Sequence, residues 1–261
     1  IAAQKVVENL LATLPTYLQH MKENNTLLGE DIARLNKTYL LPETAASHVR
    51  RIQTELESFE AAIVEVTSNQ EEPTQAYSVL EENLEDLQTQ LKDIEDEQIS
   101  VSERLTQIEK DDINARQKAN VYVNRLHTIK RYMEKRNLPG IPQTFLKLFF
   151  TASNNTEDLM VELEQKMINI ESVTRVLEIA TNDMEALETE TYNIVQYATL
   201  TEQLLQYSNR YRSFDERIQE AFNEALDIFE KEFDYHASFD KISQALEVAE
   251  PGVTNRFVTS Y

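Results

Sequence analysis

The sequence predicts an all-α protein with unusually long helices, and two observations lead to this prediction. Glycine occurs only three times and proline only six times in 261 residues. Both residues interrupt helices, glycine through the backbone entropy it loses and proline through its missing N–H group and its ring. Apolar residues also recur at alternating steps of three and four over most of the chain, which is the spacing of helices that pack along a common seam.

Composition excludes several classes of function. The chain carries 46 acidic and 25 basic residues, a formal net charge of −21, and this charge is repelled by nucleic acid and by anionic lipid headgroups. The absence of cysteine rules out disulfides, thiolate metal sites and cysteine nucleophiles. The chain contains no run of about 18 apolar residues, which is the length needed to span a bilayer. Because the chain begins with Ile1 in mid-pattern, we expect it to be part of a longer protein.

Two helices that fold back on each other are predicted at the start of the chain. The first has an apolar row that continues past Pro15 and Gly29, so we expect one kinked helix rather than a loop. Leu41-Pro42 predicts a tight turn, because a residue before proline disfavours the helical conformation. The polar stretch at residues 68–74 predicts the next turn. The two rows are Val7, Leu11, Leu14, Leu18, Met21, Asn25, Leu28, Ile32, Leu35 and Tyr39, and then Ala45, Val49, Ile52, Leu56, Phe59, Ile63 and Val66.

A single long helix is predicted to follow. Its row of core-type positions contains only two polar residues, Gln98 and Asp112. Such a row forms a coiled-coil seam, because the alternating steps keep one stripe facing its partner. Sixty residues at 1.5 Å each make a helix of about 90 Å, which a single compact globule cannot contain. The apolar members are Tyr77, Leu80, Leu84, Leu87, Leu91, Ile94, Val101, Leu105, Ile108, Ala115, Ala119, Tyr122, Leu126, Ile129 and Met133.

The charge of this long helix changes sign along its length. Residues 71–112 hold fourteen acidic and three basic side chains, whereas residues 116–136 hold seven basic and one acidic side chain. A solvated helix whose ends differ in charge explains this pattern. A docking strip for an acidic partner explains it equally, and both interpretations stay open.

The second half of the chain is predicted to start with a break, because Pro139 and Pro142 cannot continue the preceding helix. A short apolar helix is expected at residues 143–151, and its aromatic run serves either as an exposed anchor or as the core at a bundle end. Asn154 and Glu157 have the spacing of a helix N-cap and N3, which predicts the start of the next helix. Its row is Leu159, Leu163, Ile170, Val173, Leu177, Ala180, Met184, Leu187 and Ile194, and then, after a change of phase, Tyr197, Leu200, Leu204, Tyr207 and Tyr211.

Two more helices are predicted near the end of the chain. Ser213 and Glu216 repeat the capping spacing and predict the start of the first. Pro251-Gly252 is expected to end the second. Their apolar rows are Ile218, Phe222, Ala225, Phe229 and Phe233, and then Phe239, Ile242 and Leu246.

Two turns around a helix about twice as long as its neighbours favour an elongated rod of spectrin-like three-helix bundles with long shared coiled-coil helices. The predicted repeats cover residues 1–105 and 106–212 and share the helix at 74–136. C-terminal helices are expected in residues 213–261. Two long coiled-coil hairpins would show the same apolar pattern, and this alternative stays open.

The sequence offers no chemistry for catalysis, so we predict that the chain is not an enzyme and needs no cofactor. Its four histidines are scattered and lack the spacing of zinc hydrolases or di-iron bundles. Glu232, His236 and Asp240 share one helical face, but a lone histidine between carboxylates on an acidic helix is usually surface. Three isolated glycines cannot form a phosphate-binding loop.

The segment 206–212 is the candidate binding site. The amides of Gln206 and Asn209 and the guanidinium of Arg210 lie at offsets of zero, three and four, so they share one helical face. Tyr207 and Tyr211 continue the apolar stripe roughly 130° away. One interpretation is a helix C-terminal turn, where arginine interacts favourably with the negative end of the helix dipole and asparagine tolerates the end of the helix. A specific polar contact to a partner is the other interpretation. The candidate partner-binding residues are Gln206, Asn209, Arg210, Tyr211 and Arg212.

Three stretches together resemble the EzrA family, the septation ring formation regulators of low-GC Gram-positive bacteria. They are Tyr122–Pro142, Gln206–Arg212 and Glu250–Arg256, and their order and spacing make the resemblance specific. The resemblance implies a cytoplasmic rod of spectrin-like repeats and an N-terminal membrane helix outside this chain. For Gln206, Asn209 and Arg210, which match the family's patch, it implies a role in placement at the division site. The family pattern is loose at Ser208.

The resemblance also implies partners and a location. It implies binding to FtsZ, the tubulin-like division protein, restraint of ring assembly away from midcell, and links to other division proteins and cell-wall synthesis enzymes. The expected location is the cytoplasmic face of the cell membrane, enriched at the septum, with no nucleic-acid partner. The alternative is a passive coiled-coil spacer or dimerisation arm without a cytoskeletal partner. Self-association and the surface that would contact FtsZ stay open.

Overall fold

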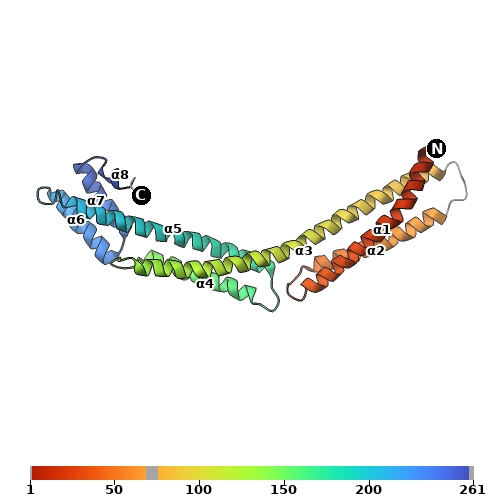
Figure 1. Cartoon of the computed structure of the whole chain (residues 1–261), viewed down its shortest axis with the longest axis horizontal. Coiled ribbons are helices and arrows are strands. Elements are labelled where there is room, and N and C mark those ends of the chain that lie inside the picture. The colour runs from red at the N-terminus through yellow and green to blue at the C-terminus, as the bar shows by residue number, and fades with distance from the viewer. Residues whose placement is uncertain (1, 69–75, 259–261) are drawn as a thin grey trace. The chain divides into compact units, whose positions relative to one another are not determined.

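The computed structural model describes residues 2–68 and 76–258, and this part of the chain is helical with no β-strand (Figure 1). The prediction of an all-α protein is confirmed. The turn predicted at residues 68–74 lies, after Ser68, outside the described residues. The helices are α1 (Ala2–Leu35), α2 (Glu43–Ser68), α3 (Ala76–Lys135), α4 (Gln143–Leu163), α5 (Ile170–Ser208), α6 (Glu216–Asp227), the π-helical turn η1 (Ile228–Glu232), α7 (Tyr235–Ala249) and α8 (Val253–Val258).

The chain divides into two compact units. The first comprises residues 1–114 and 162–173, and the second comprises residues 115–161 and 174–261. Within the described ranges, no helix has the length and apolar character needed to cross a membrane. The repeat boundaries at residues 105 and 212 and the assignment to spectrin-like repeats stay predictions.

In the first unit, α1, α2 and the beginning of α3 pack around one core. The amide of Asn25 in α1 donates to the carbonyl of Val49 in α2 at 3.1 Å, so the two helices fold back on each other as predicted from Leu41-Pro42. α1 runs through Pro15 without interruption. The core side chains come from all three helices, and they are Val7, Leu10, Leu14, Leu18, Met21, Ile52, Leu56, Phe59, Ile63, Leu84, Leu91 and Ile94.

The predicted seam of α3 is confirmed where its side chains are described, from Leu84 onward. The apolar members are buried except for the half-buried Leu87 and Ile108, while Tyr77 and Leu80 lie outside the described side chains. The two polar members are buried as well, and each bonds to a distant residue. Gln98 Nε2 donates to the carbonyl of Met21 at 2.9 Å, and the Tyr39 hydroxyl donates to Asp112 Oδ2 at 3.1 Å.

Replacing Gln98 with leucine is expected to leave the melting temperature unchanged or to raise it. Gln98 is 4% exposed, and its Oε1 has no hydrogen-bond partner among the described residues. Leucine would remove this unsatisfied acceptor, whose burial costs about 1–3 kcal/mol. Thermal unfolding followed by circular dichroism tests the prediction, with Gln88→Leu on the exposed face of α3 as the control. A clear fall for Gln98→Leu alone would mean that the bond to Met21 is worth more than the unsatisfied oxygen costs.

In the second unit, the rest of α3 packs with α4 and α5. The hydroxyls of Tyr122 in α3 and Thr181 in α5 lie 2.8 Å apart. The Thr144 hydroxyl of α4 donates to Glu190 Oε1 of α5 at 2.7 Å. Farther along the same pair of helices, Asn155 bonds to Asp183. The break predicted at Pro139 and Pro142 is confirmed, because α3 ends at Lys135 and α4 begins at Gln143.

The helix start predicted at Asn154 is wrong, since α4 continues through this residue to Leu163. Ala152, Thr156 and Leu159 are buried on one face, so packing holds the helix through the polar stretch. The chain turns instead between Leu163 and Ile170, where Asn169 Oδ1 accepts from the Ser172 N–H at 3.2 Å and caps α5. The predicted row from Leu159 to Ile194 therefore belongs to two helices. Of the aromatic run at the start of α4, Phe145 is buried and Phe150 is 66% exposed.

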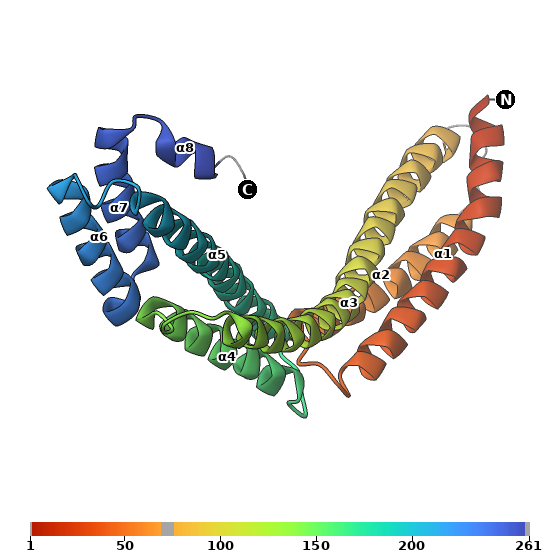
Figure 2. The ribbon, with the colours of Figure 1, turned by 60° about the vertical axis from the view of Figure 1, so that its left-hand side comes forward.

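The last part of α5 packs with α6, α7 and α8, and Figures 1 and 2 show α6 and α7 side by side. α6 begins at Glu216 and is capped by Asp215, whose carboxylate accepts from the Arg217 N–H at 3.1 Å; the predicted cap at Ser213 is wrong. α7 ends before Pro251 as predicted, but the short helix α8 that follows was not predicted. Buried residues of this core are Leu204, Leu205, Ile218, Ala225, Ile242, Leu246 and Val253.

Candidate partner-binding site

The predicted site residues lie at the C-terminal end of α5 and in the turn that leads to α6. Gln206 belongs to the last turn of α5, which ends at Ser208. Asn209 and Arg210 follow it in a tight turn, where the Arg210 N–H donates to the carbonyl of Tyr207 at 3.2 Å. All three side chains are exposed. The three candidate residues therefore surround a helix end rather than a continuous helical face.

Two guanidinium groups of this turn stack on aromatic rings. Arg210 Cζ lies 4.5 Å from the ring centroid of Tyr207, and Arg212 Cζ lies 3.7 Å from that of Phe222. Arg212 also donates to Asn209 Oδ1 at 2.9 Å and to Gln219 Oε1 at 3.0 Å. Cation–π contacts at exposed sites contribute about 0.5–1 kcal/mol each. Arg212 thus ties the turn to α6, while Arg210 keeps its polar edge toward solvent.

The two tyrosines of the segment meet at one carboxylate, that of Glu250. The hydroxyls of Tyr207 and Tyr211 each donate to Glu250 Oε2 at 2.6 Å, and Arg256 Nη1 lies 2.7 Å from Glu250 Oε1. The hydrogen bond from Tyr207, followed by that from Tyr211, lowers the pKa of Glu250 below its usual range. The hydrogen bond to Glu250 likewise raises the pKa of Tyr211. Glu250 therefore holds the end of α5 against the C-terminal segment.

The C-terminal segment is itself fixed by the neighbouring Glu247. Its carboxylate accepts from the backbone N–H of Gly252 at 2.6 Å and from that of Thr254 at 2.7 Å. These bonds lower the pKa of Glu247. Gly252 has a φ of +82°, a left-handed conformation that glycine adopts without strain. The segments 206–212 and 250–256, far apart in the sequence, thus form one site.

Phe214 adjoins the candidate site, and the sequence analysis did not name it. It lies in the turn between α5 and α6, and its side chain is 72% exposed. Its ring contacts that of Tyr211 edge-on, with centroids 5.9 Å apart. No local pattern could have identified it, because its exposure depends on where α5 ends. Phe214 therefore lies in the same turn as Asn209 and Arg210, in contact with Tyr211.

Comparison with known proteins identifies the family. The family model described as "Septation ring formation regulator, EzrA" matches residues 1–261. The chain belongs to the EzrA family. Curated relatives named septation ring formation regulator EzrA are 60% identical in Streptococcus sanguinis strain SK36 and 64% identical in Streptococcus gordonii strain Challis, over all 261 residues. The chain spans 46% of the length of each relative. No solved structure matched it.

Membership of the EzrA family confirms the resemblance inferred from the sequence. The EzrA family is not a known enzyme family. That this chain itself catalyses no reaction stays a prediction.

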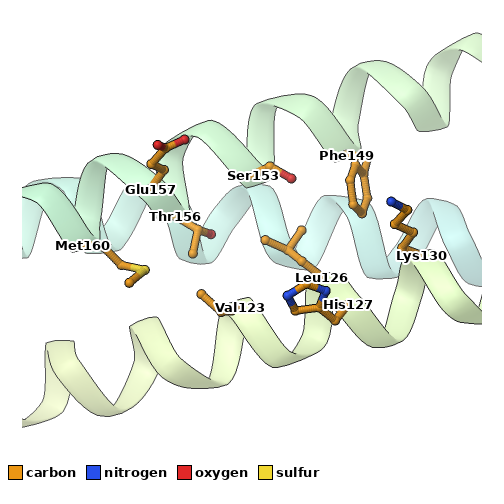
Figure 3. A pocket seen from close by; sticks show the side chains of 9 residues that line it. All are labelled: Val123, Leu126, His127, Lys130, Phe149, Ser153, Thr156, Glu157 and Met160. Atoms are coloured by element: carbon orange, nitrogen blue, oxygen red, sulfur yellow. The ribbon is translucent and has the colours of Figure 1, made fainter.

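A groove between α3 and α4 of this EzrA chain has a volume of about 340 Å³ (Figure 3). Figure 3 shows His127 on α3, with Ser153 and Glu157 on α4. These are residue types of hydrolytic sites, but no hydrogen bond joins them within the part of the chain that the structure describes. The other lining side chains are mostly apolar, namely Val123, Leu126, Phe149 and Met160. The groove therefore has no nucleophile paired with a base.

The prediction that Glu232, His236 and Asp240 share one helical face is wrong, because Glu232 ends η1 and only His236 and Asp240 belong to α7. His236 Nδ1 lies 3.3 Å from Asp240 Oδ2, and the His236 ring packs edge-on against Tyr197 with centroids 4.5 Å apart. Among the residues with described positions, no group of three or more histidine, aspartate or glutamate side chains is arranged to hold a metal ion.

Proposed function

We propose that this chain is part of a membrane-tethered division regulator that binds FtsZ and restrains ring assembly away from midcell. The proposal includes a scaffolding link to cell-wall synthesis proteins and a location at the cytoplasmic face of the septal membrane. Its basis is membership of a family of septation ring formation regulators over residues 1–261. The observation that carries the site assignment is the exposed Gln206, Asn209 and Arg210 on a turn that Glu250 and Arg212 hold in place.

Co-sedimentation with FtsZ polymers, with and without GTP, tests the proposed partner. We expect the chain to pellet with FtsZ only when GTP allows polymers to form. A passive spacer would stay in the supernatant and would leave FtsZ polymerisation unchanged. Bovine serum albumin, an acidic protein of another family, provides the control for trapping in the pellet.

Replacing Gln206, Asn209 and Arg210 together with alanine is expected to abolish midcell placement without unfolding the protein. Their side chains are exposed, and exposed changes usually shift the free energy of unfolding by under about 0.5 kcal/mol. The variant is introduced into the full-length protein and imaged by fluorescence. Circular dichroism of the purified variant measures its melting temperature.

A matched control replaces the same residue types on an exposed face of α3, at Gln117, Asn124 and Arg131. This control should keep midcell placement. If the site variant were destabilised, or were stable and still reached midcell, the site assignment would be wrong, although the family assignment would stand.

A further inference from the structure

The turn between α5 and α6 carries positive charge that the chain does not neutralise. Arg210 contacts the ring of Tyr207 and forms no ion pair with any described residue, while Arg212 bonds only to amide oxygens. The nearby Arg217 and Arg256, in contrast, pair with Asp215 and Glu250. A free guanidinium is notable in a chain with 46 acidic and 25 basic residues. The planar guanidinium of Arg210 is therefore available to bind a carboxylate from outside the chain.

Phe214 places a large apolar surface in the same turn. At 72% exposed, it is more exposed than Phe150 at 66% or Tyr192 at 63%. Aromatic residues and arginine are enriched at protein–protein interfaces, and Phe214 follows Arg210 by four positions in this turn. Because both side chains lie in one turn of only a few residues, a single partner segment could contact them together.

The turn is also held in its conformation before any partner binds. The hydroxyls of Tyr207 and Tyr211 bond to Glu250, and the stacking of Arg210 on Tyr207 limits the motion of its side chain. A surface that is already ordered loses less conformational entropy on binding. Exposure, charge and rigidity thus occur together in this turn.

From these observations, we propose that the α5–α6 turn binds an acidic segment of a partner protein. This segment places a carboxylate on Arg210 and an apolar surface on Phe214. The inference rests on the proposed role of Gln206, Asn209 and Arg210 in partner binding, and it adds the chemistry of the partner and Phe214 as the anchor. An anionic membrane or a nucleic acid is disfavoured, because both require several free cations and the chain has a net charge of −21.

Photo-crosslinking in the full-length protein in cells tests the partner chemistry. A photoreactive phenylalanine analogue replaces Phe214, and in a control it replaces Tyr192, an exposed aromatic residue of α5. We expect position 214, but not 192, to crosslink to a peptide rich in aspartate and glutamate. The Arg210→Glu change should lower the yield at position 214 by about tenfold or more, and Arg210→Lys should lower it less, because lysine keeps the charge without the planar fork. Crosslinking to a basic peptide, to lipid or to nucleic acid, or an equal yield at both positions, overturns the proposal.

Imaging separates this inference from the proposed function. We expect Phe214→Ala to lose midcell placement at an unchanged melting temperature, while Tyr192→Ala keeps it. If the triple alanine variant at 206, 209 and 210 loses midcell placement but Phe214→Ala does not, the assignment of Phe214 as the anchor is wrong and the proposed function stands. If the triple variant itself reaches midcell, the proposed role of Gln206, Asn209 and Arg210 is wrong.

Discussion

Replacing Leu91 with alanine is expected to lower the free energy of unfolding by about 2–5 kcal/mol. Leu91 is fully buried in the middle of the α3 row, and it belongs to the core that α1 and α2 complete. Alanine removes the apolar contacts and leaves a cavity that helices on both sides cannot fill without moving. Replacing Leu105, which is 6% exposed, with alanine is expected to lower the free energy of unfolding by an amount in the same range. Urea denaturation followed by far-ultraviolet circular dichroism measures the change.

The control for this prediction is Ile113→Ala on the same helix. Ile113 is 56% exposed, so its replacement should change the free energy of unfolding by no more than about 0.5 kcal/mol. A Leu91→Ala variant that unfolds at the same urea concentration as the wild type would show that the α3 row is not buried in solution.

The long seam could be predicted from sequence because its signal follows directly from helix geometry. Steps of three and four put one stripe on one face, and burial of that stripe requires only that some partner covers it. The partners themselves could not be predicted. Gln98 bonds to Met21 and Asp112 to Tyr39, residues more than seventy positions away in the sequence, and nothing local marks these pairs.

The two wrong helix starts show where local signals fail. The capping spacing at Asn154 and at Ser213 also occurs by chance in a chain rich in polar residues. At Asn154, the buried Thr156 hydroxyl donates to the carbonyl of Ala152 at 2.7 Å, and the helix continues. The actual turn before Asn169 contains neither proline nor glycine. The sequence therefore has no turn signal there that would have argued against a helix start at Asn154.

The candidate site was only partly visible in the sequence. Exposure of Gln206 and partial burial of Tyr207 follow from the periodicity of α5, whereas Arg210 lies in the turn beyond the end of this helix. Glu250 could not be assigned to the same site, since its contact with Tyr207 depends on how α7 and α8 return to α5. Phe214 was missed for the related reason that the helix stops at Ser208.

Replacing Gly140 with alanine is expected to destabilise the second unit by about 1–3 kcal/mol. A Cβ atom at this position would lie 2.4 Å from Cζ of Phe233. The added Cβ therefore requires the Phe233 ring or the loop at Gly140 to shift. Phe233 ends η1 in a left-handed conformation with a φ of 60°, and the Tyr235 hydroxyl holds the loop by donating to the carbonyl of Gly140 at 2.8 Å. Thermal unfolding of the purified variant measures the loss.

The Gly29→Ala change provides a control that is expected to shift stability in the opposite direction. It lies inside α1, where an added Cβ would meet only Val49, at 3.9 Å. Gly29→Ala is therefore expected to stabilise the protein by about 0.5–1 kcal/mol, because alanine loses less backbone entropy in a helix. If the clash with Phe233 is the cause at Gly140, adding Phe233→Ala should make the Gly140→Ala change less destabilising, as a double-mutant cycle would measure. Equal losses for Gly140→Ala with and without Phe233 would point to the loop backbone instead.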